Sequence, residues 1–385
     1  MRALVLTAVS TALSTLAMSL PASAVSLYSI TDLGSLNPLD LNDSGQIIAG
    51  DGANTLLWQN GTTVDLTFMG GRAINNLGQI AGAKNGELFL READGTVTNL
   101  GLPNCFNPIA GFPCGYEYVN DINDAGQILL NGRLGAINWN GTYMESALAR
   151  RDANGTLAII NGSADFITTN GYEMNDFGQV PYSQTSHGHG LQSGSAFIFN
   201  GSTSTQLSSP HIVNPINSVH SAFRNAANDI NNQGQIVGMT KYAWEYYRWI
   251  PIRQQMQATL WTDANTAINL GTLGGDNSEA KSINNFSQIV GWANNTSNDQ
   301  TATIWENNQI FDLNNFLVNG TGWQLTSANL INNNQQIVGT GTFNGQTHTF
   351  LLNAVSPQSV PEPTGVLGLL GIGAIAFTQR QSRRR

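Results

Sequence analysis

A short pattern of apolar and polar residues recurs along most of this chain. Its most regular part is an apolar pair, an Asn-x-x-Gly segment and then Gln-Ile-Val-Gly, as in INNQGQIVGM at 230–239. Seven copies are recognisable, beginning at Asn42, Asn75, Asn123, Asn175, Asn231, Asn284 and Asn332. These asparagines are 33, 48, 52, 56, 53 and 48 residues apart. A period of this size indicates a repeat architecture such as a propeller or a solenoid.

Each copy is predicted to form four short strands. The Asn-x-x-Gly segment predicts a turn between the first two, because Asn tolerates left-handed conformations and Gly accepts positive φ. The third strand carries an aromatic residue, as in ATLW at 258–261, and a fourth follows, as in TAINL at 266–270. In three copies an Asn-Gly pair, which is a strong hairpin signal, separates the third and fourth strands. These pairs are Asn60-Gly61, Asn140-Gly141 and Asn200-Gly201. The repeated Gln is a hypothetical link between neighbouring copies.

Four strands in about 48 residues match one propeller blade. We therefore predict an all-β fold, a seven-bladed β-propeller spanning residues 25–354. The seventh copy ends at residues 348–352 without a fourth strand, whereas the segment YSITDLGSL at 28–36 resembles one. We expect this N-terminal strand to complete the last blade and close the ring. The alternative is an open β-solenoid or a pair of stacked sheets.

Both ends of the chain carry targeting patterns. Residues 1–24 contain one Arg, an apolar stretch and the small residues Ala22 and Ala24, which predict a signal peptide cleaved after Ala24. After a linker at 355–360, the tail at 361–385 contains 13 uncharged residues from Gly365 to Phe377. They predict a short apolar transmembrane helix, although a spanning helix usually needs about 20 residues.

This tail resembles the PEP-CTERM sorting signal of bacteria. The matching parts are the tripeptide Pro361-Glu362-Pro363, the apolar segment and a terminal run of Arg383, Arg384 and Arg385. The resemblance implies processing by an exosortase after passage through the secretion machinery, with transient insertion of the tail in the inner membrane. It implies a location at the cell surface or in the extracellular matrix, released or anchored, and an association with biofilm and extracellular polysaccharide.

The repeated unit also resembles the HAF-repeat family of bacterial extracellular proteins. The matching residues are the Ile-Asn-x-x-Gly-Gln-Ile-Val-Gly core and the aromatic strand that follows it. The naming His-Ala-Phe triplet is degraded, as in Ser195-Ala196-Phe197 and His348-Thr349-Phe350, and Ser287 and Gln335 replace the glycine of the last two cores. This resemblance implies an extracellular repeat domain and brings no assigned chemistry.

The charge of the chain argues against one class of ligand, and its two cysteines predict a disulfide. Charged residues make up 11% of the chain, and the net charge is −9, which argues against binding to nucleic acid because an acidic surface repels phosphates. Cys105 and Cys114 lie in one loop, and behind a signal peptide such a pair predicts a disulfide.

Candidate chemistry is sparse, and no cofactor or metal is expected. Asp40 begins a partial match to a calcium-loop pattern, and His187 and His189 lie one residue apart in a Gly/Ser-rich segment. We interpret both as ordinary polar turns or loops. The carboxylates Asp121, Glu173 and Asp229 are scattered in sequence, and a glycosidase would need such groups to converge from distant blades.

An aromatic-rich segment at 239–257 lengthens the fifth copy. Its candidate ligand contacts are Tyr242, Trp244, Tyr246 and Trp249, because exposed aromatic side chains suit sugar stacking or partner binding. The simpler interpretation is a long hairpin whose rings pack on the domain.

From these features we expect a non-enzymatic, exported surface or matrix protein that displays loops for polysaccharide or protein contacts. A carbohydrate-binding propeller that uses the 239–257 aromatics is the first alternative. A glycoside-active propeller enzyme is the second, although no known catalytic motif is present.

Overall fold

The computed structural model describes residues 26–50, 54–101, 115–133, 146–163, 167–188, 191–210, 221–247 and 250–355. Within these ranges the regular secondary structure is β-strand, apart from one 3-10 helix, η1 (Leu313–Phe316). The all-β prediction is therefore confirmed. No helix in this part of the chain is long and apolar enough to cross a membrane. The expected signal peptide, the cysteine pair and the C-terminal tail lie outside the described residues.

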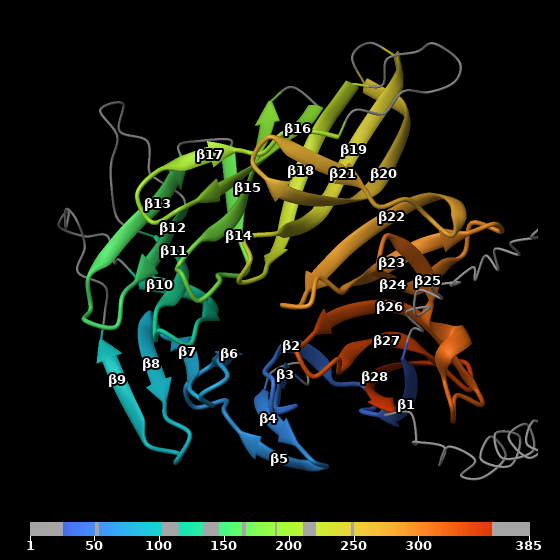
Figure 1. Ribbon diagram of the computed structural model, residues 1–385. Coiled ribbons are helices and arrows are strands. Elements are labelled where there is room, and N and C mark those ends of the chain that lie inside the picture. The colour runs from blue at the N-terminus through green and yellow to red at the C-terminus, as the bar shows by residue number, and fades with distance from the viewer. Residues whose placement is uncertain are drawn as a thin grey trace, which may run out of the picture.

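The strands form seven antiparallel groups of four, one for each sequence repeat (Figure 1). We call these groups units one to seven. Unit one contains β2 (Asn37–Leu41), β3 (Ile47–Gly50), β4 (Thr55–Gln59) and β5 (Thr62–Asp65). Unit two contains β6 (Gly71–Ile74), β7 (Ile80–Lys84), β8 (Glu87–Arg91) and β9 (Val97–Gly101). Unit three contains β10 (Gly115–Ile122), β11 (Ile128–Arg133), β12 (Ser146–Arg151) and β13 (Leu157–Ser163).

The remaining units follow the same order. Unit four contains β14 (Ile167–Gly171), β15 (Val180–Gly188), β16 (Leu191–Phe199) and β17 (Ser204–Gln206). Unit five contains β18 (Ser221–Ile230), β19 (Ile236–Tyr247), β20 (Ile250–Asp263) and β21 (Thr266–Asn269), and one parallel pair between Gly194 and Arg224 joins it to unit four. Unit six contains β22 (Gly274–Ile283), β23 (Ile289–Asn295), β24 (Gln300–Glu306) and β25 (Gln309–Asp312).

Unit seven is built from both ends of the described chain. It contains β26 (Trp323–Ile331), β27 (Ile337–Phe343), β28 (Gln346–Val355) and the N-terminal strand β1 (Leu27–Asp32). β1 pairs antiparallel with β28, with Tyr28 opposite Ala354 and Asp32 opposite Phe350. This is the pairing that the sequence predicts for the N-terminal segment. It places the beginning of the domain beside its end, and in Figure 1 the blue and red strands lie together.

The turn between the first two strands of each unit explains the repeated Asn and Gly. The glycine has a positive φ, for example 78° at Gly78, and its N–H donates to the carbonyl of the repeat asparagine Asn75 at 3.0 Å. Ser287 and Gln335 occupy the same left-handed conformation, with φ of 62° and 60°. The turn therefore keeps its shape in the last two units, although a side chain there costs roughly 1–2 kcal/mol.

Two cycles of hydrogen bonds connect the units at these turns. The Nδ2 of each repeat asparagine donates to the backbone carbonyl of the repeat asparagine in the next unit, at 2.9 to 3.1 Å, and Asn332 donates to Asn42. The N–H of the residue after each asparagine donates to the side chain of its counterpart in the next unit, at 2.8 to 3.0 Å. Both cycles pass through all seven units.

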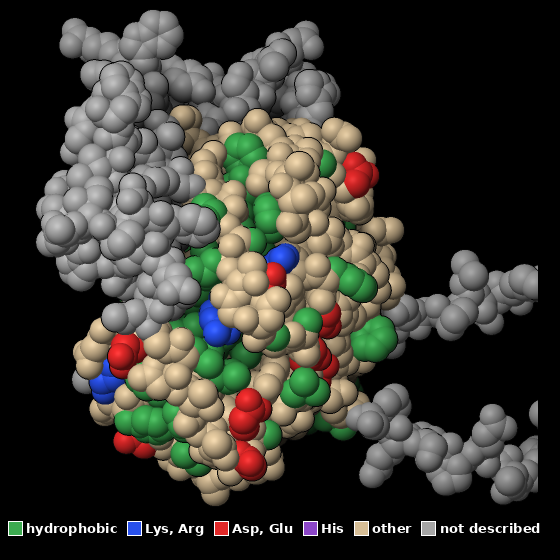
Figure 2. Space-filling model, turned by 90° about the vertical axis from the view of Figure 1, so that its left-hand side faces the viewer, with side chains coloured by type: hydrophobic (Ala, Val, Ile, Leu, Met, Phe, Trp, Pro, Cys, Tyr) green, Lys and Arg blue, Asp and Glu red, His purple; other side chains and the backbone are tan. Residues whose placement is uncertain are grey.

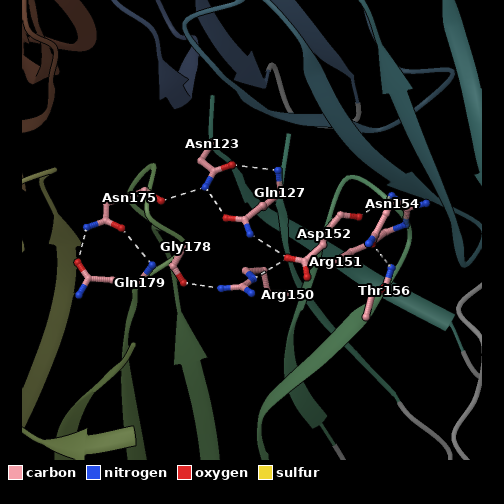
Figure 3. Close-up of polar contacts among 10 residues, drawn as sticks. All are labelled: Asn123, Gln127, Arg150, Arg151, Asp152, Asn154, Thr156, Asn175, Gly178 and Gln179. Atoms are coloured by element: carbon pink, nitrogen blue, oxygen red, sulfur yellow. Dashed lines mark hydrogen bonds and ion pairs between the residues drawn. The ribbon is translucent and has the colours of Figure 1, made fainter. Parts of the chain in front are cut away.

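The repeated Gln bonds mainly within its own unit, and a contact to the next unit occurs at Gln235, whose Oε1 accepts from the hydroxyl of Ser287 at 2.7 Å. The Oε1 of the repeated Gln accepts from the repeat asparagine, as at Gln127 from Asn123 (2.9 Å), and its Nε2 donates to Asp152 in the same unit. The buried Arg150 connects this group to unit four, because its guanidinium contacts both Asp152 and the carbonyl of Gly178 (Figure 3). The Gln therefore holds the asparagine amide in place to donate to the next unit.

The hydrophobic core lies between the units. Seven clusters of buried side chains each combine residues of two neighbouring units, and one of them joins Val338 and Leu351 of unit seven to Ile47 of unit one. A single four-stranded unit cannot cover its own apolar faces, so each unit depends on both neighbours. The outer surface carries few charged side chains among uncharged ones, as Figure 2 shows for one side of the molecule.

Candidate functional site

A polar cavity of about 160 Å³ lies where the first strands of all seven units end. Its lining includes the repeat asparagines, the residues that follow them and the residues that precede them by one or two positions. No Lys, Arg or His is among its lining residues, whereas seven carboxyl groups are: Asp40, Asp43, Asp121, Asp124, Glu173, Asp176 and Asp229. The cavity is therefore strongly acidic.

Four of these carboxyl groups occupy one repeat position, two residues before the repeat asparagine. They are Asp40, Asp121, Glu173 and Asp229, and the other units have Ala73, Ser282 and Leu330 there. In six units a β-bulge precedes this position, for example between Val119 and Asp121 in β10. A bulge changes the direction in which neighbouring side chains point. Two consecutive residues on the first strand of a unit, the inner strand, can therefore both point toward the next unit.

The three aspartates at this position connect adjacent units through backbone amides. Asp121 accepts from the N–H of Ile122 in its own unit at 2.6 Å and from Met174 in the next unit at 2.7 Å. Asp40 accepts from Leu41 and Ile74 in the same way, and Asp229 from Ile230 and Ile283. In the seventh unit, the corresponding amide donates to the hydroxyl of Ser282. The backbone N–H groups of the seven residues directly before the repeat asparagines therefore all donate to one of these side chains.

Glu173 is the carboxyl group left over. An aspartate at position 173 would accept from the N–H of Ile230 in the next unit. That N–H already donates to Asp229. Among the described residues, no group donates a hydrogen bond to the Glu173 carboxyl. A half-buried carboxyl without partners contributes nothing evident to folding and costs desolvation free energy. Such groups concentrate at functional sites.

Burial raises the pKa of all four carboxyl groups, and neighbouring carboxylates raise it further for Asp40, Asp121 and Glu173. Burial raises the pKa of Asp40 and of Asp229 to about 6, against the pull of their amide hydrogen bonds. Burial and then the charge of Asp40 raise the pKa of Asp121. For Glu173, burial and then the charges of Asp121, Asp229 and Asp40 raise the pKa well above 4.5, and no hydrogen bond opposes the shift. The surroundings thus favour the neutral form of these carboxyl groups, and at Glu173 no hydrogen bond works against that preference.

This arrangement can donate and accept protons at one place. A carboxylic acid kept neutral by its surroundings is a general acid, and a nearby ionised carboxylate is a general base or nucleophile. Cleavage of a glycosidic bond uses such a pair. The described residues contain no group of three or more His, Cys, Asp or Glu side chains that could together hold a metal ion.

The structure also locates the other candidates from the sequence. Asp40, which begins the calcium-like pattern, directs both carboxylate oxygens to backbone amides. Tyr242 is only 1% exposed and its hydroxyl donates to the carbonyl of Pro210, so its assignment as a surface ligand contact is wrong. Trp244 and Tyr246 lie in β19, but their side chains, like Trp249, fall outside the described residues. The same holds for the side chains of His187 and His189.

The convergence of Asp121, Glu173 and Asp229 was not evident from the sequence, because they are separated by 52 and 56 residues. A signal was nevertheless present. Each stands two residues before a repeat asparagine, and these residues line one cavity.

Comparisons with known proteins add similarity in fold only. No family model matches the chain, and no curated protein matches it. Propeller-like solved structures are similar to it. A streptogramin B lyase has a TM-score of 0.45 at 11% identity, covering 86% of this chain and 98% of that one. An oligogalacturonate lyase in complex with manganese has a TM-score of 0.46 at 12% identity. A gluconolactonase from Xanthomonas campestris has a TM-score of 0.36 at 10% identity. Each of these two matches covers 86% of this chain and 91% of the other chain.

These comparisons correct the expected function. The three structures named above are enzymes, which contradicts the prediction of a non-enzymatic display protein. At 10–12% identity the likeness concerns the fold, and the activities named for those proteins are not transferred to this chain. The function has to be argued from the cavity itself.

Proposed function

We propose that this chain is a seven-bladed β-propeller enzyme that cleaves a glycosidic bond, with Glu173 as the proton donor. The single observation that carries the proposal is that no described residue donates a hydrogen bond to the carboxyl group of Glu173. All seven backbone amides at its level have other acceptors, so its carboxyl stands unpaired in the cavity with a raised pKa.

Three features support the closed seven-bladed architecture. The two hydrogen-bond cycles pass from Asn332 and Asn333 back to Asn42 and Asp43. A buried cluster joins unit seven to unit one. The N-terminal strand supplies the fourth strand of the last unit, which leaves no open edge between the first and last repeats.

The chemistry assigns different roles to the carboxyl groups. Glu173, whose raised pKa favours the neutral form, would protonate the oxygen of the leaving group. Asp40 and Asp229 have pKa values near 6, so their ionised forms would act as base or nucleophile on the opposite side of the sugar. Their amide hydrogen bonds fix the aspartates in position, whereas Glu173 lacks such restraint and is free to approach a substrate.

The test is turnover by the purified mature protein on a panel of oligosaccharides, followed by the release of reducing ends. We expect Glu173→Gln to lower kcat by about 10²- to 10⁴-fold, the usual contribution of a general acid. Activity should fall as pH rises through the raised pKa of Glu173, because only the protonated form donates. Glu87→Gln, at an exposed hydrogen bond to Asn99, is the matched control and should leave kcat unchanged.

Two results would overturn the proposal. One is a folded wild-type protein that releases no reducing ends from any saccharide of the panel. The other is an active protein in which Glu173→Gln and Glu87→Gln have equal turnover.

We further propose that the enzyme is exported and sorted through its ends. The support is sequence-based: the small residues Ala22 and Ala24 after an apolar stretch, and the tail with Pro361-Glu362-Pro363 and its terminal arginines. Mass spectrometry of the protein from fractions of its native host should find a chain that begins at Val25 and ends near Pro363. Intact termini in the cytoplasmic fraction would contradict this location.

A further inference from the structure

A second cluster lies on the inner strands and on β19, on the side of the acidic cavity away from the Asn turns. It consists of Arg72, Tyr118, Tyr172, Arg224, Lys241, Glu279 and Lys281, and we call it the cationic cluster. Tyr172 is close enough to Arg224, Glu279 and Arg72 for their charges to act on its hydroxyl. Three members stand at the repeat position directly before the carboxyl position: Arg72 before Ala73, Tyr172 before Glu173 and Lys281 before Ser282. These three members therefore form the residue layer directly before the carboxyl position of the acidic cavity.

Contacts between units join the members of the cationic cluster. The guanidinium of Arg72 lies 5.8 Å from the ring centre of Tyr118 in the next unit. Arg224 and Lys241 are directly opposite each other in β18 and β19. Glu279 of unit six accepts from Asn228 of unit five at 3.1 Å.

Glu279 is the one acid of the cationic cluster, and it is already engaged. Its Oε2 accepts from the indole of Trp292 at 3.1 Å and lies 3.2 Å from the ammonium of Lys281. The cationic cluster thus contains one carboxylate and four cationic side chains. Burial and then Arg224 lower the pKa of Lys241, as expected where positive charges face one another.

This concentration of positive charge is unusual for the chain. The whole sequence has 16 Lys and Arg against 25 Asp and Glu, and four of the 16 gather here. Tyr118 and Tyr172 beside them are 56% and 50% exposed. Exposed phenol rings next to guanidinium groups suit a ligand with both an apolar ring face and an anionic group, because Arg pairs with carboxylates in a fork geometry.

We propose that the cationic cluster binds the carboxylate of an acidic saccharide, so that the enzyme acts on a uronate-containing chain. The tyrosine rings would stack on the sugar, while Arg72 with Arg224 and Lys241 hold its carboxylate. A sugar bound there lies one residue layer from Glu173. The identity of the substrate rests on the proposed function, whereas the binding itself depends only on the cationic cluster.

Direct binding tests this inference separately from turnover. Isothermal titration would compare oligogalacturonate with its methyl ester, which has the same backbone without the charge, in the Glu173→Gln protein. We expect the acid to bind at least about 10-fold more tightly than the ester, since hydrogen bonds to charged groups contribute roughly 1.5–3 kcal/mol. Arg72→Gln should lower affinity for the acid by at least about 10-fold, whereas Arg91→Gln on β8, the third strand of unit two, should not change it.

Equal binding of acid and ester, or equal affinities of the Arg72→Gln and Arg91→Gln proteins, would overturn the inference. Competition by inorganic phosphate at the same concentration as the uronate would also overturn it, because the site would then recognise any anion. Tight binding of the acid with no turnover by the wild-type protein would support the cationic cluster and refute the proposed reaction.

Discussion

Replacing Tyr28 by Ala is expected to lower the free energy of unfolding by about 3–5 kcal/mol, the usual cost of removing a buried aromatic side chain. Tyr28 is fully buried in the cluster that joins units six and seven, although it lies near the N-terminus of the described chain. Its backbone carbonyl accepts from Val318 at 2.9 Å, and the neighbouring Ile30 N–H donates to Asn319. The substitution therefore removes the main apolar anchor of β1.

The conservative substitution should act in the opposite direction. No group among the described residues pairs with the buried hydroxyl of Tyr28, and burial, then the charge of Glu306, raises its pKa well above the usual range. Tyr28→Phe removes this unsatisfied hydroxyl and should raise stability by about 1 kcal/mol.

Denaturant unfolding followed by tryptophan fluorescence would measure both effects. Phe177→Ala is the matched control, because that ring is 72% exposed, and it should change stability by less than about 0.5 kcal/mol. If Tyr28→Ala matched Phe177→Ala, the N-terminal strand would not complete the last unit, and the closed architecture would have to be abandoned.

The sequence predicted the strands and turns because these depend on short-range chemistry. Asn followed by Gly three residues later specifies the first turn of each unit, and even Ser287 and Gln335 adopt the required left-handed conformation. The pairing of β1 with β28 was also predictable, since the missing fourth strand of the last repeat and the extra strand at the start complement each other.

The site was less accessible to sequence reasoning for a physical reason. Glu173 differs from Asp121 and Asp229 in function only because the amides around it already have acceptors, and that depends on the next unit. The cationic cluster likewise combines Arg72 of one unit with Tyr118 of the next. Tyr242 shows the reverse error, because alternation along a strand does not reveal which side is buried. The roles of Glu173, the cationic cluster and Tyr242 all depend on contacts between units, which the sequence of a single repeat does not show.

The asparagine cycle provides the second large effect on stability. Asn284 is 3% exposed, and its side chain makes four hydrogen bonds. Its Nδ2 donates to Gln288 Oε1 at 2.7 Å and to the carbonyl of Asn332 in the next unit at 3.1 Å, while its Oδ1 accepts from the N–H groups of Phe286 and Gln288. Since each bond contributes about 1 kcal/mol net, Asn284→Ala should lower the free energy of unfolding by about 4 kcal/mol.

Two further variants identify the cause of that loss. Asn269→Ala, at an exposed position with one hydrogen bond to Gly271, should cost no more than about 1 kcal/mol. Asn284→Asp keeps the acceptor but places a carboxylate against two oxygens, so its destabilisation should be largest at neutral pH and should shrink as the pH falls and the carboxyl is protonated. Thermal unfolding at several pH values would measure this. Equal losses in Asn284→Ala and Asn269→Ala would contradict a stabilising role for the cycle, because the bonds that connect the units would then contribute no more than a surface turn.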